Sequence, residues 1–257
     1  MSPYKLLKND EGFLLIEVAI ALLIMGIILG FGMPKIFSYL TLQKRKETTE
    51  RQERIFHSVA AFSIQYGYIP LPADPYALPD QFGWARSRAS SEKDLVGLVP
   101  YKTLGLPADY SKDGFNHYFT YAGGWPNPGF VTRKIQTICQ MRLPFPLNIS
   151  SYAGPDPILL TLISYGEKGR GAYKGSPGHL YRNREGLTAG EKQNAAEDLG
   201  FIDQAPTPNF DHHVAWVTGR NLMAIYGKVP MEELNKPDTD SAAIFTSGNR
   251  QTTEGIA

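Results

Sequence analysis

Apolar positions form one long run near the amino terminus of the chain. From Phe13 to Met33 the sequence reads FLLIEVAIALLIMGIILGFGM, and Glu17 is the only charged residue in it. As a helix this run would be roughly 30 Å long, which matches the hydrocarbon core of a bilayer. A buried core helix and a secretory signal peptide are the alternatives, but both usually have shorter all-apolar stretches. The pattern predicts a transmembrane helix over residues 13–34.

The polar stretch that follows continues the helix. Residues 43–54 contain neither Gly nor Pro, and two acids stand four residues before Arg51 and Arg54. Each such pair adds about 0.2–0.5 kcal/mol to helix stability. Further along, four apolar residues recur at spacings of four, three and four, which places them on one helix face. That face is expected to pack on a sheet formed by the rest of the chain; its residues are Ile55, Val59, Phe62 and Tyr66.

Turn residues and short apolar runs alternate after residue 66, where 38 of the 44 Gly and Pro residues are found. Segments 115–121, 158–165 and 213–218 are rich in β-branched and aromatic residues and predict strands. The spacing from Thr188 to Glu191 is that of a capping box and predicts a helix as far as about Leu199. We therefore expect an α+β fold. In it, a long amino-terminal helix, transmembrane in one half and amphipathic in the other, packs on an antiparallel-sheet head.

Charge is divided unevenly between the two parts. Residues 1–66 carry 8 basic and 6 acidic side chains, whereas the remaining 191 residues carry 18 and 19, a net charge of −1. A nearly neutral head provides no long-range attraction for the phosphates of nucleic acid, so nucleic acid is not an expected partner. A local DNA-binding patch of Arg182, Arg184 and Lys192 remains an alternative. The single cysteine, Cys139, excludes a disulfide within the chain.

The start of the apolar run carries a recognisable motif. The residues Gly12-Phe13-Leu14-Leu15-Ile16-Glu17 follow a short polar segment and open the long apolar helix. This resembles the class III leader of type IV pilins and of the pseudopilins of type II secretion systems. The resemblance implies cleavage between Gly12 and Phe13 by a prepilin peptidase, followed by N-methylation of Phe13. It also implies an assembly contact through Glu17 and a helix kink at Pro34.

The resemblance implies four regions. They are a leader over residues 1–12, a transmembrane helix over 13–34, a helical stalk over 35–66 and a periplasmic globular head over 67–257. The chain would be anchored in the inner membrane by a single pass and incorporated into a pilus or pseudopilus. Basic residues are more numerous after the apolar run and by themselves favour a cytoplasmic head. We follow the leader motif because it is more specific.

The expected function is structural rather than enzymatic. A head of 191 residues is large for a subunit that repeats many times, so a minor pilin or pseudopilin is expected. The expected partners are the prepilin peptidase, other pilin or pseudopilin subunits, the inner-membrane assembly platform and membrane lipid. The alternatives are a minor pilin that captures DNA during competence and a membrane-tethered periplasmic enzyme that uses Asp211 and His212.

Other groups with chemical potential are weaker candidates. The glycine-rich stretch 166–175 matches no phosphate-binding pattern and is interpreted as a hairpin tip. Asp211, His212 and His213, with Asp203 nearby, include metal-capable groups, but adjacent histidines on a strand point to opposite faces. No metal, cofactor or catalytic residue is therefore predicted. Asp238 and Asp240 offer oxygen ligands for calcium without further matching ligands, and Cys139 is interpreted as a buried thiol.

Overall fold

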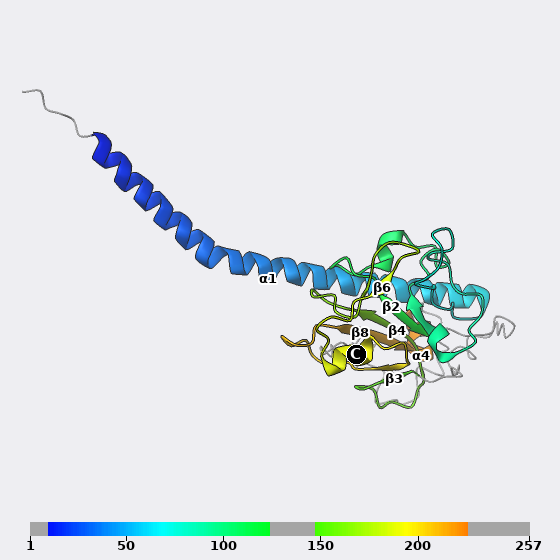
Figure 1. The fold of residues 1–257 in the computed structure, drawn as a ribbon. Coiled ribbons are helices and arrows are strands. Elements are labelled where there is room, and N and C mark those ends of the chain that lie inside the picture. The colour runs from blue at the N-terminus through cyan, green and yellow to red at the C-terminus, as the bar shows by residue number, and fades with distance from the viewer. Residues whose placement is uncertain (1–9, 124–146, 226–257) are drawn as a thin grey trace, which may run out of the picture. The chain divides into compact units, whose positions relative to one another are not determined.

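The computed structural model describes residues 10–123 and 147–225. The chain divides into two units, an amino-terminal unit (Met1–Gln43) and a globular unit (Lys44–Ala257). The elements in chain order (Figure 1) are α1 (Asp10–Tyr66), the 3₁₀ helix η1 (Glu92–Leu95), β1 (Val96–Leu98), the 3₁₀ helix η2 (Ala108–Ser111), β2 (Thr120–Gly123), β3 (Asn148–Ile149), β4 (Ile158–Ser164), β5 (Tyr173–Lys174), β6 (Tyr181–Arg182), α3 (Ala189–Asn194), β7 (Gly200–Phe201), β8 (His213–Thr218) and α4 (Gly219–Ile225).

The structure of the amino-terminal unit contradicts one part of the expected fold class, the transmembrane half of the long helix. Within residues 10–123 and 147–225, no helix is both long and apolar enough to cross a membrane, so the predicted transmembrane half over residues 13–34 is wrong. The fold is α+β with an antiparallel sheet.

The globular unit is built around a four-stranded antiparallel sheet with the order β1-β2-β4-β8. All seven residues of the inner strand β4 are buried. A strand that is apolar on both faces needs cover on both. Residues from α1, β7 and α4 join the sheet in one continuous core, with Phe56, Phe201 and Leu222 as examples. Two small two-stranded sheets, β3-β7 and β5-β6, complete the described strands.

Two of the three predicted strands are confirmed. Residues 158–165 and 213–218 correspond to β4 and β8. The third predicted strand, over residues 115–121, is wrong for residues 115–119, because β2 begins only at Thr120. The preceding residues form a turn in which Oδ1 of Asp113 accepts the backbone N–H groups of Phe115 and His117, both at 2.9 Å. Asn116 in this turn has a φ of 68°, which is incompatible with a strand.

The apolar face predicted on α1 is confirmed for three of its four residues. Ile55 and Val59 are fully buried, and Phe62 is 9% exposed. Tyr66 is 46% exposed and is the exception. It lies in the last turn of α1, where its ring packs at 4.5 Å from the ring of Phe62 instead of reaching the sheet. The helix ends at Tyr66, and the next residue, Gly67, has a φ of 79°, the left-handed conformation found after many helix carboxyl ends.

The capping box of α3 is confirmed, but the helix is shorter than expected. The hydroxyl of Thr188 accepts the N–H of Glu191, and the Glu191 carboxylate accepts the N–H of Thr188. α3 ends at Asn194 rather than at Leu199. The reason is that the Asn194 side chain pairs with both the N–H and the carbonyl of Ile202, at 2.6 and 2.9 Å, which turns the chain back.

This cap supplies a first prediction. Thr188→Ala removes the hydroxyl that accepts the Glu191 N–H and is expected to lower the free energy of unfolding by about 1 kcal/mol. Urea denaturation of the full chain followed by circular dichroism measures the change. Thr188→Ser keeps a capping hydroxyl and is expected to remain within about 0.5 kcal/mol of the original protein. Equal losses in the two variants would show that the hydroxyl does not act as a cap.

The glycine-rich stretch 166–175 is not the tip of a hairpin, which corrects the expectation. β5 occupies residues 173–174 and pairs with β6 at residues 181–182, so the hairpin tip lies at residues 175–180. The preceding glycines form tight turns: Gly171 donates its N–H to the carbonyl of Asn183 at 2.7 Å. These turns direct the chain from the end of β4 to the start of β5.

Candidate functional site

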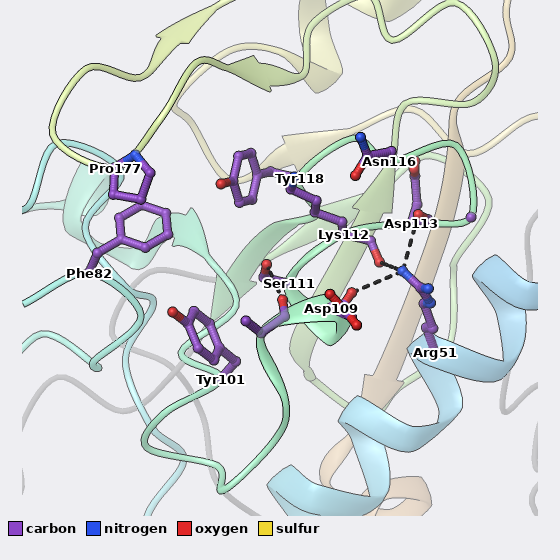
Figure 2. A pocket seen from close by; sticks show the side chains of 12 residues that line it. Arg51, Phe82, Tyr101, Asp109, Ser111, Lys112, Asp113, Asn116, Tyr118 and Pro177 are labelled. Atoms are coloured by element: carbon purple, nitrogen blue, oxygen red, sulfur yellow. Dashed lines mark hydrogen bonds between the residues drawn. The ribbon is translucent and has the colours of Figure 1, made fainter. Parts of the chain in front are cut away.

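A pocket of about 330 Å³ opens beside α1 in the globular unit. Figure 2 shows Arg51 reaching from α1 toward the backbone of residues 109–113. Its Nη1 donates to the carbonyls of Asp109 and Lys112, both at 2.9 Å. Its Nη2 donates to the Glu47 carboxylate. Arg51 therefore fastens the helix to the loop and is not a free cation for a ligand.

The opposite wall of the pocket is aromatic. The rings of Phe82 and Tyr118 meet edge to face with their centroids 5.9 Å apart, and Tyr101 lies near them. The ammonium of Lys112 sits 4.9 Å from the centre of the Tyr118 ring. Burial raises the pKa of both the Tyr101 and the Tyr118 hydroxyls, so these groups stay protonated at neutral pH. The pocket therefore has one aromatic wall and one polar, charged wall, and its two tyrosines are not acid–base groups at neutral pH.

A buried carboxylate lies at the edge of this pocket. Asp113 is 1% exposed, and its Oδ2 accepts the hydroxyl of Ser164 at 2.6 Å. Burial raises the pKa of this carboxyl, against the lowering effect of the hydrogen bonds from Ser164 and His117. His117 Nδ1 lies 3.0 Å from the carbonyl of Gly166. Because the serine donates to the aspartate and not to the imidazole, the three groups do not have the order of a nucleophilic triad.

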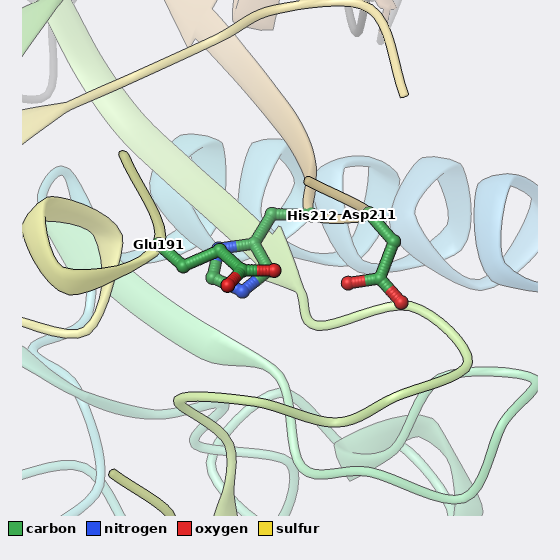
Figure 3. Close-up of side chains that lie close together, drawn as sticks. All are labelled: Glu191, Asp211 and His212. Atoms are coloured by element: carbon green, nitrogen blue, oxygen red, sulfur yellow. The ribbon is translucent and has the colours of Figure 1, made fainter. Parts of the chain in front are cut away.

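A second cluster joins Glu191 of α3 to Asp211 and His212, the two residues directly before β8. One potential ligand atom from each side chain lies within 4.8 Å of the others. Figure 3 shows the Glu191 side chain extending to the His212 ring, with the Asp211 carboxylate beside them. Glu191 is fully buried, and His212 is 1% exposed. Two carboxylates and one imidazole therefore meet in a largely desolvated space.

Each member of this cluster is held through one of its polar atoms. Oε2 of Glu191 lies 3.6 Å from Nη1 of Arg170, and Nε2 of His212 lies 2.8 Å from the carbonyl of the same arginine. Oδ2 of Asp211 accepts the backbone N–H of Lys168 at 2.9 Å. Among the residues that the structure describes, the remaining atoms Glu191 Oε1, Asp211 Oδ1 and His212 Nδ1 are buried and have no hydrogen-bond partner.

The two adjacent histidines have different surroundings. Burial lowers the pKa of His212, although the charges of Glu191 and Asp211 oppose the shift. Burial, helped by the charge of Arg45, lowers the pKa of His213 to about 4. Both imidazoles are therefore neutral at neutral pH. His213 is not a member of the cluster, in agreement with the expectation that the two side chains would not share one ion.

The other sequence-predicted residues are scattered. Gly12, Phe13 and Pro34 lie within α1, which continues through the proline, and Glu17 is an exposed residue of the same helix. Asp203 is apart from the cluster, and its Oδ2 accepts the hydroxyl of Ser151 at 2.7 Å. Three predicted residues lie outside the described residues: Cys139, Asp238 and Asp240. Cleavage, methylation and the helix kink stay predictions.

The structure contradicts the alternative DNA-binding patch of Arg182, Arg184 and Lys192, because Arg182 is not on the surface. Arg182 is 8% exposed. Its Nη1 donates to the hydroxyl of Tyr165 at 2.7 Å and to the carbonyl of Gly171 at 2.8 Å. The guanidinium also lies 4.2 Å from the centre of the Tyr173 ring. A cation held in this way inside the fold cannot reach a phosphate on the surface.

The first part of α1 presents apolar side chains in every direction. Leu22, Leu23, Ile24 and Met25 are between 50% and 64% exposed. Successive helix positions differ by 100°, so four consecutive residues sample all sides of the helix. Leu15 is 74% exposed and Ile28 is 63% exposed, which extends the apolar surface along the unit. An isolated soluble helix is rarely apolar on all sides, so this surface requires a partner.

Comparison of the chain with protein-family models, with curated proteins and with solved structures finds no match.

The cluster of Glu191 with Asp211 and His212 was not predicted from the sequence, which assigned Glu191 only to the cap. The residues stand 20 positions apart and belong to different elements. The one signal was the buried cap itself, since a capping glutamate uses one carboxylate oxygen and leaves the other available.

Proposed function

We propose that this chain is a minor structural subunit of a type IV pilus or a type II secretion pseudopilus. In this role it is processed by a prepilin peptidase and assembled through its amino-terminal helix. The observation that supports the proposal most is the exposed apolar surface around residues 15–28 of α1. Helices from neighbouring subunits that pack side by side would cover that surface. Complete burial of one large apolar side chain contributes about 1.5–3 kcal/mol, so many such contacts hold a bundle together.

Glu17 would fix the axial position of neighbouring helices relative to one another in such a bundle. It is the single charged residue between Phe13 and Met33. Packed among apolar side chains, its carboxylate is costly unless it meets a positive group. Cleavage after Gly12 creates that group, because it gives Phe13 a free amine. A neighbouring helix placed so that its amine meets Glu17 satisfies both charges, and a shifted neighbour leaves both unpaired.

The amino terminus of the mature protein tests the processing step. Mass spectrometry of protein purified from its native cells is expected to show a chain that begins at Phe13 and carries one methyl group. Gly12→Leu is expected to retain residues 1–12, because a large side chain then replaces the small residue directly before the cut. A mature protein that still begins at Met1 would exclude the proposal.

Glu17→Ala tests the assembly step. The loss of one partner of a buried ion pair costs about 3–5 kcal/mol, so the variant is expected in the filament fraction at less than a tenth of the normal amount. Immunoblotting of sheared filaments, relative to total protein, measures this ratio. The control is Glu50→Ala, which removes an exposed carboxylate that lies 3.7 Å from the Lys46 ammonium. Normal incorporation of the Glu17 variant would contradict the assigned role.

A further inference from the structure

We propose that Glu191, Asp211 and His212 bind one divalent transition-metal ion, with Zn²⁺ as the best match, in the interior of the globular unit. The proposal rests on the meeting of three potential ligand atoms within 4.8 Å. It also rests on the burial of polar atoms that lack partners among the described residues. It is independent of the proposed assembly function, since none of the three residues belongs to α1.

Several buried polar atoms of the cluster have no hydrogen-bond partner among the described residues. A buried polar atom without a hydrogen bond costs about 1–3 kcal/mol, and more when the group is charged, so native proteins rarely keep several together. This cluster contains three such atoms, one from each residue: Glu191 Oε1, Asp211 Oδ1 and His212 Nδ1. A bound cation would satisfy carboxylate oxygens and an imidazole nitrogen at once.

The second polar atom of each of the three side chains is hydrogen-bonded to the backbone. Ligands of a metal are usually oriented by hydrogen bonds through their non-ligating atoms. Here the backbone N–H of Thr188 holds Glu191 Oε2 at 2.9 Å, and the N–H of Lys168 holds Asp211 Oδ2 at the same distance. The carbonyl of Arg170 accepts from Nε2–H of a neutral His212, which leaves the lone pair on Nδ1. These contacts hold one polar atom of each side chain and leave the other without a hydrogen-bond partner among the described residues.

The choice of ion follows from the donor set. Calcium and magnesium select oxygen ligands, whereas zinc accepts imidazole nitrogen together with carboxylate oxygen in a tetrahedral site. Two carboxylates also attract a divalent cation, with part of their charge offset by the Arg170 guanidinium, 3.6 Å from Glu191 Oε2. Tetrahedral ligands about 2.0–2.2 Å from zinc lie roughly 3.3–3.6 Å from one another. Ligand atoms up to 4.8 Å apart would therefore move about 1 Å closer together on binding.

Bound zinc would connect α3 to the chain segment that enters β8. These elements are separated by residues 195–210, which include β7, and the ion would cross-link them without a disulfide. Such a link stabilises the folded state in proportion to the metal occupancy, because the unfolded chain has no preformed site. The position therefore predicts a structural role, with binding visible as a change in stability.

Titration calorimetry with Zn²⁺ alone, on metal-free full-length protein at neutral pH, tests the proposal. All proteins carry Cys139→Ser so that a thiolate does not bind the ion. We expect one Zn²⁺ per chain and an affinity that falls at least about tenfold in Asp211→Asn and in His212→Gln. His57→Gln changes an exposed imidazole of α1 and is expected to bind zinc normally.

Thermal unfolding supplies a second measurement on the same proteins. Excess Zn²⁺ is expected to raise the melting temperature of the parent and of the His57 variant, while Asp211→Asn and His212→Gln respond much less. Circular dichroism without metal identifies any variant that does not fold, and the remaining variant then decides. Absence of zinc binding by the parent would overturn the proposal, as would equal affinity in a folded variant of Asp211 or His212.

Discussion

Replacement of Phe56 by alanine is expected to lower the free energy of unfolding of the globular unit by about 3–5 kcal/mol, the largest effect that we predict for a single substitution. Phe56 is fully buried in the core that joins α1 to the sheet. Loss of its ring removes apolar burial and leaves a cavity that the surrounding strands cannot close. Because small domains have only about 5–15 kcal/mol of stability, such a loss is a large fraction of the total.

Urea denaturation of the full chain measures this change, in a neutral detergent that keeps the apolar part of α1 dispersed. The adjacent residue provides a matched control, since His57 is exposed on the same helix turn. His57→Ala is expected to change the free energy of unfolding by no more than about 0.5 kcal/mol. Equal stability of the Phe56 and His57 variants would show that the helix does not depend on its contact with the sheet.

The second large effect concerns Asp113. Asp113→Ala removes a carboxylate that accepts two backbone N–H groups and the hydroxyl of Ser164. Donors left buried without acceptors cost about 1–3 kcal/mol each, so the expected loss is about 3 kcal/mol or more. The turn that these bonds hold determines where β2 begins. We therefore also expect faster amide hydrogen exchange in residues 113–120.

Asp113→Asn separates the hydrogen bonds from the charge. The asparagine carbonyl still accepts both backbone N–H groups, and its amide can donate to the Ser164 hydroxyl. The variant also removes a charge whose burial is unfavourable, as the raised pKa of Asp113 indicates. We expect it to retain most of the stability, within about 1.5 kcal/mol. A loss as large as that of the alanine variant would show that the negative charge itself is required.

Sequence periodicity predicted the parts of the fold in which one physical effect dominates. β4 and β8 are continuous apolar or β-branched runs, and burial on both faces leaves them no other arrangement. The segment before β2 was mistaken for a strand because its aromatic residues favour extended backbone. The Asp113 carboxylate overrides that preference through hydrogen bonds within the turn. Side-chain competition of this kind is not visible in a count of apolar positions.

The candidate metal site shows a different gap between sequence and structure. Asp211 and His212 were noticed because they are adjacent, but only His213 and Asp203 were considered beside them, and no metal site was predicted. The actual companion, Glu191, comes from a helix 20 residues earlier in the chain. Its position depends on where α3 ends, and that end is set by the contacts of Asn194 with Ile202. Contacts between distant segments decide such sites, and spacing along the chain does not encode them directly.

The packing of α1 on the sheet has a consequence for protein synthesis. Gln52 of the helix donates its side-chain N–H to the carbonyl of Leu162, at 3.5 Å and 110 residues later in the chain. β8, which completes the described sheet, ends only at Thr218. During synthesis, the apolar face of the helix therefore leaves the ribosome before the strands that cover it. It stays uncovered until most of the remaining chain has been translated. Folding of the globular unit is thus a late event, and a nascent chain that stops before β8 would expose this face to chaperones and proteases.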